Sequence, residues 1–339
     1  MPDAAQARLG ELVASARALA LVGLAKNTGK TVTLRAILAE HAAAGRAVGV
    51  TSIGRDGERH DVIDARIEKP SVELQAGDLV ASTGALLRAS GVEHERLEQT
   101  GVRTPLGEVV LARLSEPGAI EVAGPSAASD ARAVAERMLE LGAAQALIDG
   151  AIDRRAASSP AVADGLVMAT GAILAEQLDD VVARTSDAVD LVRLARAELD
   201  SEHVTVARAL VLNAQPEEIA ALLRKHPHAS AFVVDGALGE RFLEGLLAAR
   251  NERAGRELRI VAADPTHVFL SRRGPRWYAR QGIAIEVLRT IELKAITVNP
   301  IAPQSHSFDS RELRESIESA VSDVPVLDVL DASYLAFAK

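Results

Sequence analysis

The sequence predicts an α/β fold in which a mostly parallel sheet is flanked by helices, followed by a second α/β half. The first observation is a short apolar run at residues 18–23 that leads through a small polar loop into a helical stretch at 31–44. Another apolar run follows at 46–53, and strand–helix–strand order is how a parallel sheet begins. The second observation is that the same alternation resumes after about residue 200.

The remaining elements are placed along the chain by the same criteria. Residues 4–17 have the spacing of an amphipathic helix, and Gly45 is placed to end the helix at 31–44. A hairpin is expected over the turn in the segment SEPG. Further strands are expected at 109–114, 119–122, 144–149, 164–170, 204–212, 231–234, 258–263 and 294–298, and further helices at 126–141, 178–199, 216–225, 239–250 and 310–322.

The change in regularity near residue 200 predicts two regions. Residues 1–200 form a nucleotide-binding domain and residues 201–339 a second α/β region; one continuous domain is the alternative, because no low-complexity linker separates them. The segments LIDGAID (147–153) and VVDGALG (233–239) resemble each other. This similarity marks either a second α/β half or chance in a chain rich in Ala and Gly.

Composition excludes several functional classes. The formal net charge of −9 argues against a general binder of nucleic acids or acidic membranes, which needs a basic surface. The absence of cysteine removes disulfides, thiolate catalysis and Cys-ligated metal sites. The N-terminal segment lacks the order of a signal peptide, and the apolar run at 18–25 is too short to span a bilayer. We therefore expect a soluble, cytoplasmic protein.

The segment GLAKNTGKT (23–31) is typical of a phosphate-binding P-loop, or Walker A motif, because it joins a predicted strand to a predicted helix. Backbone N–H groups of such a loop and the following helix N-terminus attract anions. Lys30 would contact the β- and γ-phosphates, and the Thr31 hydroxyl would bind Mg²⁺. The common motif would place glycine at position 24, where Leu24 stands. The other expected phosphate-binding residues are Gly23, Lys26, Asn27, Thr28 and Gly29.

Two acids follow predicted strands and are candidate metal ligands and catalytic residues together with Lys30. Asp56 comes just after the strand at 46–53, and Asp149 ends the apolar strand in ALIDGAIDR. Sites in α/β proteins are built at the carboxyl ends of strands, and a buried strand that ends in Asp is the Walker B arrangement. The alternative for Asp56 is a polar Asp-Gly turn.

The longer loop resembles that of dethiobiotin synthetases, which carry a glycine, five residues and then Gly-Lys-Thr. Division-site and plasmid-partition ATPases of the same SIMIBI branch of P-loop NTPases have a lysine in the loop, but Lys26 lies one position away from it. The acid before Gly-Ala in LIDGAID is similar to that of VEGAGG in dethiobiotin synthetases. In proteins of this kind, an Asn-Pro after a late strand supplies an amide to adenine. The resemblance implies this role for Asn299, with Asn213 as a rival and strand capping as the alternative.

Three longer segments resemble one family more closely. They are GLAKNTGKTVTL, LIDGAIDRRAASSPAVADGLVMATGA and AITVNPIAPQSHSFDS. They are similar to the ATP-binding reactivase subunit associated with B12-dependent lysine 5,6-aminomutase and ornithine aminomutase. The resemblance implies an ATP-driven, chaperone-like exchange of damaged cobalamin together with a larger partner.

Three functions are consistent with these observations. The first is a Mg²⁺-dependent ATPase switch that acts on a partner protein. The second is an enzyme that transfers the phosphate of ATP to a small carboxylate, and the third is a non-catalytic nucleotide sensor. The expected cofactors are ATP and Mg²⁺, and the absence of the guanine-reading motif Asn-Lys-x-Asp favours ATP over GTP. The expected partners are a protein and ATP, with no nucleic acid and no membrane; a homodimer stays open.

Overall fold

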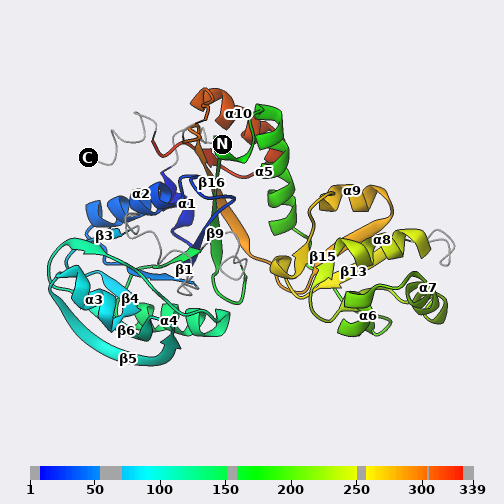
Figure 1. Ribbon diagram of the computed structural model, residues 1–339, viewed down its shortest axis with the longest axis horizontal. Coiled ribbons are helices and arrows are strands. Elements are labelled where there is room, and N and C mark those ends of the chain that lie inside the picture. Colours follow the sequence, from blue (N-terminus) through cyan, green and yellow to red (C-terminus); the bar gives the residue numbers. More distant parts are fainter. Residues whose placement is uncertain (1–7, 54–70, 151–158, 250–256, 304, 331–339) are drawn as a thin grey trace. The chain divides into compact units, whose positions relative to one another are not determined.

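The computed structural model describes residues 8–53, 71–150, 159–249, 257–303 and 305–330 (Figure 1). The chain forms two compact units: Met1–Thr185 with Glu292–Lys339, and Ser186–Ile291. The sequence placed a boundary near residue 200 and assigned everything after it to the second region. In the structure the last segment returns to the first unit, because local periodicity does not encode which sheet a strand joins.

A nine-stranded sheet forms the centre of the first unit. The sheet is mostly parallel, as predicted; β6 is antiparallel to both β4 and β5 at one edge. In spatial order, its strands are β17 (Val326–Leu327), β16 (Glu292–Asn299), β9 (Gly165–Gly171), β1 (Ala18–Gly23), β8 (Ala146–Gly150), β2 (Gly49–Ser52), β4 (Leu79–Thr83), β6 (Gly107–Leu114) and β5 (His94–Thr104).

Strand β1 explains why this part of the sequence reads as a continuous apolar run. All of its residues are buried, as expected for a central parallel strand that is covered on both faces. On one face, Leu19 and Leu21 pack in the same core cluster as Leu34 and Ile37 of helix α2. The helices of this unit are α1 (Leu9–Val13), α2 (Lys30–Ala43), α3 (Gly84–Ser90), α4 (Ala128–Glu140), α5 (Leu178–Val192, which continues into the second unit) and α10 (Ser310–Val321).

The second unit is a smaller α/β unit. The four strands of its larger sheet are parallel and lie side by side in chain order: β10 (Val204–Val206), β11 (Phe232–Val234), β13 (Leu258–Ala262) and β15 (Ile283–Val287). Phe232, Phe242 and Tyr278 are fully buried in its core. Its helices are α6 (Arg208–Asn213), α7 (Pro216–Lys225), α8 (Glu240–Ala249) and α9 (Pro275–Arg280). Strands β12 (Leu238–Gly239) and β14 (Val268–Phe269) form a short two-stranded sheet.

Some predicted elements differ in extent or pairing. The hairpin expected over SEPG does not form, because β7 (Gly118–Ile120) pairs with β3 (Val72–Leu74) while β6 pairs with β5. The strand expected at 204–212 ends at Val206, and helix α6 begins at Arg208. Among the described helices, none combines the length and apolar character needed to cross a membrane.

Candidate functional site

The predicted phosphate loop lies between β1 and α2, at the carboxyl edge of the first sheet. Two of its residues have a left-handed backbone, Asn27 with φ 65° and Gly29 with φ 90°. Asn and Gly are the residues that adopt this conformation at least cost. Gly29 is the N-cap of α2, and among the described side chains none caps this helix. The N–H groups of the first turn of α2 are therefore left facing the loop.

Threonines hold the loop in this shape. Thr28 is buried, and its Oγ1 donates to the Ala25 carbonyl oxygen at 3.0 Å. A Cβ on Gly23 would lie 2.5 Å from Thr28 Oγ1, so glycine is required where the loop folds back. Thr33 Oγ1 lies 3.2 Å from the carbonyl oxygen of Gly29, to which it donates. Thr28 thus closes the loop, whereas Lys26 and Asn27 are exposed.

Lys30 and Asp149, which the sequence placed in separate motifs, form an ion pair in the structure. Lys30 is the first residue of α2, and Asp149 is aligned with Leu21 in the β1–β8 register. Their side chains are 22% and 30% exposed, so both are open to a ligand. Thr31 follows in the first turn of α2 and is half-buried. The loop, the lysine and one predicted acid therefore come together at one edge of the sheet.

Asn299 also reaches this site, from the end of β16. Its Nδ2 donates to the Asn27 carbonyl oxygen at 2.8 Å, and its Oδ1 accepts from the Ile301 N–H at 3.1 Å. Both halves of the amide are thus bonded to the backbone. The sequence-based expectation that Asn299 contacts adenine stays a prediction, and its contact with the loop was not expected.

Asp56, the other predicted acid, lies outside the described residues. Among the described side chains, no cluster of three His, Cys, Asp or Glu groups that could hold a metal forms. The groups at the loop nevertheless suit a nucleotide with a hard cation. An ammonium and a helix N-terminus favour phosphate, and one carboxylate with one hydroxyl leaves the remaining Mg²⁺ positions to phosphate oxygens and water.

Two serines near the same edge of the sheet were missed by sequence reasoning. Ser52 Oγ, at the end of β2, accepts from the Gly124 N–H at 2.9 Å. Ser82 Oγ, in β4, donates to Glu121 O at 2.8 Å and accepts from the Ala123 N–H at 3.1 Å. They fix the segment 121–124, which leads toward α4. Serine at the end of an apolar strand was the available signal, but it is too common to identify a partner.

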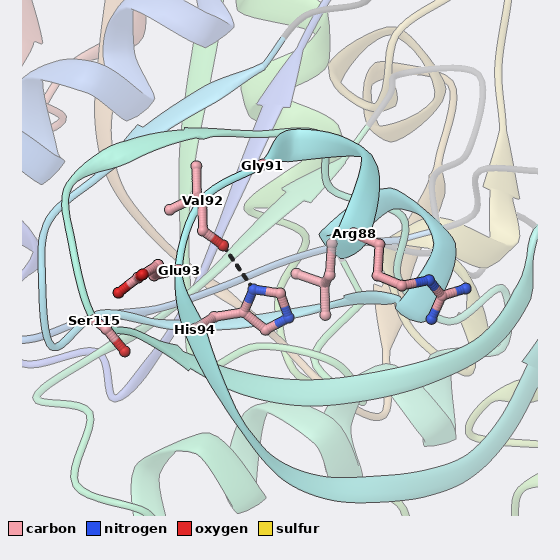
Figure 2. A pocket seen from close by; sticks show the side chains of 7 residues that line it. Arg88, Gly91, Val92, Glu93, His94 and Ser115 are labelled. Atoms are coloured by element: carbon pink, nitrogen blue, oxygen red, sulfur yellow. Dashed lines mark hydrogen bonds between the residues drawn. The ribbon is translucent and has the colours of Figure 1, made fainter.

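A shallow hollow near the edge strand β5 offers fewer groups that could bind a ligand. It is lined by residues from the end of α3 to the start of β5 and by the residue that follows β6: Leu87, Arg88, Gly91, Val92, Glu93, His94 and Ser115. His94 Nδ1 donates to the Val92 carbonyl oxygen at 2.8 Å, which leaves Nε2 as the acceptor of the neutral ring. Figure 2 shows the Arg88 and Glu93 side chains directed away from each other. These charges therefore do not converge on a common point.

Comparisons with known proteins add no family to this picture. No protein-family model, no curated protein and no solved structure matches the chain significantly. The loop, the Lys30–Asp149 pair and the sequence resemblance are therefore the features that bear on function.

Proposed function

We propose that this protein is a Mg²⁺-dependent, ATP-binding and ATP-hydrolysing switch that acts on a partner protein. The observation that carries the proposal is Lys30 at the uncapped N-terminus of α2, paired with Asp149 at the end of the adjacent parallel strand. An uncapped helix N-terminus with a lysine attracts phosphate, and a carboxylate beside it attracts a cation.

The ion pair supports this proposal because a metal–nucleotide complex offers each partner a replacement. The phosphates are anionic ligands for Lys30, and Mg²⁺ is a cationic ligand for Asp149 and Thr31. Bound Mg²⁺ would supply Lewis-acid stabilisation of charge on the transferred phosphoryl group. Lys30 would hold the phosphates, Asp149 and Thr31 would orient the metal, and the loop N–H groups would neutralise charge. Asp56 is proposed as the group that positions water or contacts the metal.

The partner is proposed from the sequence resemblance. The reactivase family implies that ATP turnover exchanges damaged cobalamin in a B12-dependent aminomutase, together with a larger subunit. Nucleotide binding would act on a partner only through different affinities for two conformations. The second α/β unit, Ser186–Ile291, offers additional surface for such a partner.

Two other functions are kept as alternatives. A phosphotransferase that activates a small carboxylate would use the same loop and metal ligands, as dethiobiotin synthetases do. A nucleotide sensor would use the loop without turnover. Turnover raised by a protein favours the switch, turnover that waits for a small acid favours the transferase, and tight binding without turnover favours the sensor.

The first test is a calorimetric titration of the purified chain with MgATP and then with MgGTP. The same samples are assayed afterwards for ADP, GDP and free phosphate. We expect ATP-selective binding with slow phosphate release, after which a B12-dependent aminomutase is the first partner to add. Absence of binding by either nucleotide would overturn the proposal.

A further inference from the structure

We infer that Asn299 is a positioning residue that holds the phosphate loop in its anion-binding form, and that it does so by binding the loop backbone. This inference rests on the proposed nucleotide function. It assigns to the end of β16 a role in phosphate affinity that is independent of the base.

The contact joins two segments that are far apart in sequence. Asn299 Nδ2 donates to the carbonyl oxygen of Asn27, the residue with φ 65° at the tip of the loop. A residue with a left-handed backbone orients its carbonyl group and the following N–H group differently from a residue with a right-handed backbone. Successive N–H groups of such a stretch can then face one anion. A donor that binds the Asn27 carbonyl oxygen stabilises this orientation of the peptide.

The orientation of the Asn299 amide is fixed from the other side. Its Oδ1 accepts from the Ile301 N–H at 3.1 Å, which leaves Nδ2 to donate to the loop. Because Asn27 O can only accept, this assignment of the two amide atoms is the one that the contacts require.

Close packing holds the Asn299 backbone as well. Asn299 is aligned with Gly171 in the β16–β9 register, and a Cβ on Gly171 would lie 2.2 Å from the Asn299 carbonyl oxygen. On the loop side, a Cβ on Gly29 would lie 3.3 Å from Asn299 Cβ. Asn299 is thus placed between a glycine of β9 and the glycine at the N-cap of α2, so its position follows that of both elements.

The two possible roles of Asn299, positioning the loop and contacting the base, predict different effects of removing its side chain. If Asn299 contacted the base, its removal would weaken ATP binding and would leave binding of inorganic triphosphate unchanged. If it positions the loop, both ligands lose affinity by the same factor. Loss of one neutral hydrogen bond corresponds to about three- to tenfold in Kd.

The experiment measures Kd for MgATP and for magnesium triphosphate by calorimetry in the full-length wild-type chain and in Asn299→Ala. Gln215→Ala is the control, because it removes an amide side chain at an exposed position of the second unit. Circular dichroism and the melting temperature show whether each variant is folded, and Asn299→Gln replaces Asn299→Ala if the latter does not fold.

We expect Asn299→Ala to weaken the binding of both ligands about three- to tenfold, and Gln215→Ala to leave both affinities unchanged. Weaker MgATP with unchanged triphosphate in a folded Asn299 variant would overturn positioning in favour of base contact. Unchanged affinity for both would overturn any role of Asn299 while leaving the proposed function intact. Failure of the wild-type chain to bind either ligand would instead refute the proposed function, and this inference with it.

Discussion

Each unit of the molecule contains a cation–aspartate pair in nearly the same topological position. In the first unit, Lys30 begins the helix after β1 and pairs with Asp149 of the adjacent parallel strand β8. In the second, Arg208 begins the helix after β10 and pairs with Asp235, which follows the adjacent parallel strand β11, at 3.3 Å. Both acids precede Gly-Ala, in the two similar segments noted in the sequence.

What differs is the connection before the helix. Residues 24–29 separate β1 from α2 and include two left-handed positions, whereas Ala207 alone, with an extended backbone, separates β10 from α6. The helix α2 has 14 residues and α6 has 6. The pair in the second unit is also more exposed, 64% and 55% against 22% and 30%. A cation and an acid at strand ends are thus shared features, and the loop is the feature on which the proposed phosphate site of the first unit depends.

The largest expected effect comes from removing the cation of each pair. We expect Lys30→Ala to abolish measurable MgATP binding or turnover in a folded protein, because even one charge-assisted hydrogen bond is worth about 1.5–3 kcal/mol, or roughly 10- to 150-fold in Kd. Arg208→Ala, the matched variant, leaves both unchanged. Calorimetry with MgATP and a phosphate-release assay measure the difference.

Two results would contradict this comparison between the pairs of the two units. Unchanged ATP affinity in folded Lys30→Ala would show that the loop is not the site. A loss in Arg208→Ala equal to that in Lys30→Ala would show that the second unit takes part in nucleotide binding, against the distinction drawn from the loops. The melting temperature of each variant excludes unfolding as the cause.

A smaller and more selective effect is expected from the acids. Asp149→Asn keeps the size of the side chain and removes the charge that a cation needs. We expect magnesium-dependent turnover to fall at least about tenfold, because metal stabilisation of transition-state charge is worth several kcal/mol. Binding of metal-free ATP, measured in EDTA, is retained, since the anion is no longer opposed by a nearby carboxylate.

Asp235→Asn serves as the control for this measurement and leaves both quantities as in the wild type. Equal loss of metal-dependent turnover and metal-free binding in Asp149→Asn would point to a structural role for the carboxylate. In that case the Lys30–Asp149 pair would resemble the pair in the second unit more than we propose.

The loop and its aspartate were predictable because each lies within a short contiguous segment. An apolar run, a small polar loop and a helical stretch predict the elements at 18–44, where the structure has β1 and α2. An apolar run that ends in Asp predicts the strand at 144–149, where the structure has β8. Because carboxyl ends of parallel strands share one edge, the sequence placed both groups at that edge of a sheet. The adjacency of β1 and β8, and with it the Lys30–Asp149 ion pair, came from the structure.

The parts that were missed depend on pairing between distant segments. Periodicity gave the strand at 294–298 but not its return to the first sheet, so the contact of Asn299 with Asn27 had no sequence signal. The edge strand β5 was missed because its segment HERLEQTGVRT is largely polar and its residues are exposed or half-buried. Charged residues are how proteins protect edge strands, and they hide the alternation that would reveal one.

The smallest effect concerns the far end of α2, which carries a buried histidine that α6 lacks. His41 is 5% exposed; its Nε2 donates to Gln145 Oε1 at 3.0 Å, and within the described part of the chain its buried Nδ1 has no hydrogen-bond partner. Gln145 Nε2 donates to the Val13 and Ala16 carbonyls, so its oxygen must face the ring. Protonation would therefore add a buried N–H without an acceptor.

Burial lowers the pKa of His41 below its usual 6.5, and the positive charge of Arg46 lowers it further. The hydrogen bond to Gln145 and the charges of Asp78 and Glu40 raise the pKa but do not offset this effect. Below pH 6.5 the unfolded chain takes up this proton before the folded chain does. The stability that neutral His41 contributes is thus present above pH 6.5 and is lost as the pH falls. Burial raises the pKa of Asp78, which changes stability in the opposite direction at lower pH.

We expect the melting temperature to fall more between pH 7.5 and 5.5 in the wild type than in His41→Gln. His228→Gln, at an exposed site of the second unit, is expected to follow the wild type. Parallel pH profiles for the wild type and His41→Gln would show that the buried ring does not link proton uptake to the stability of the first unit.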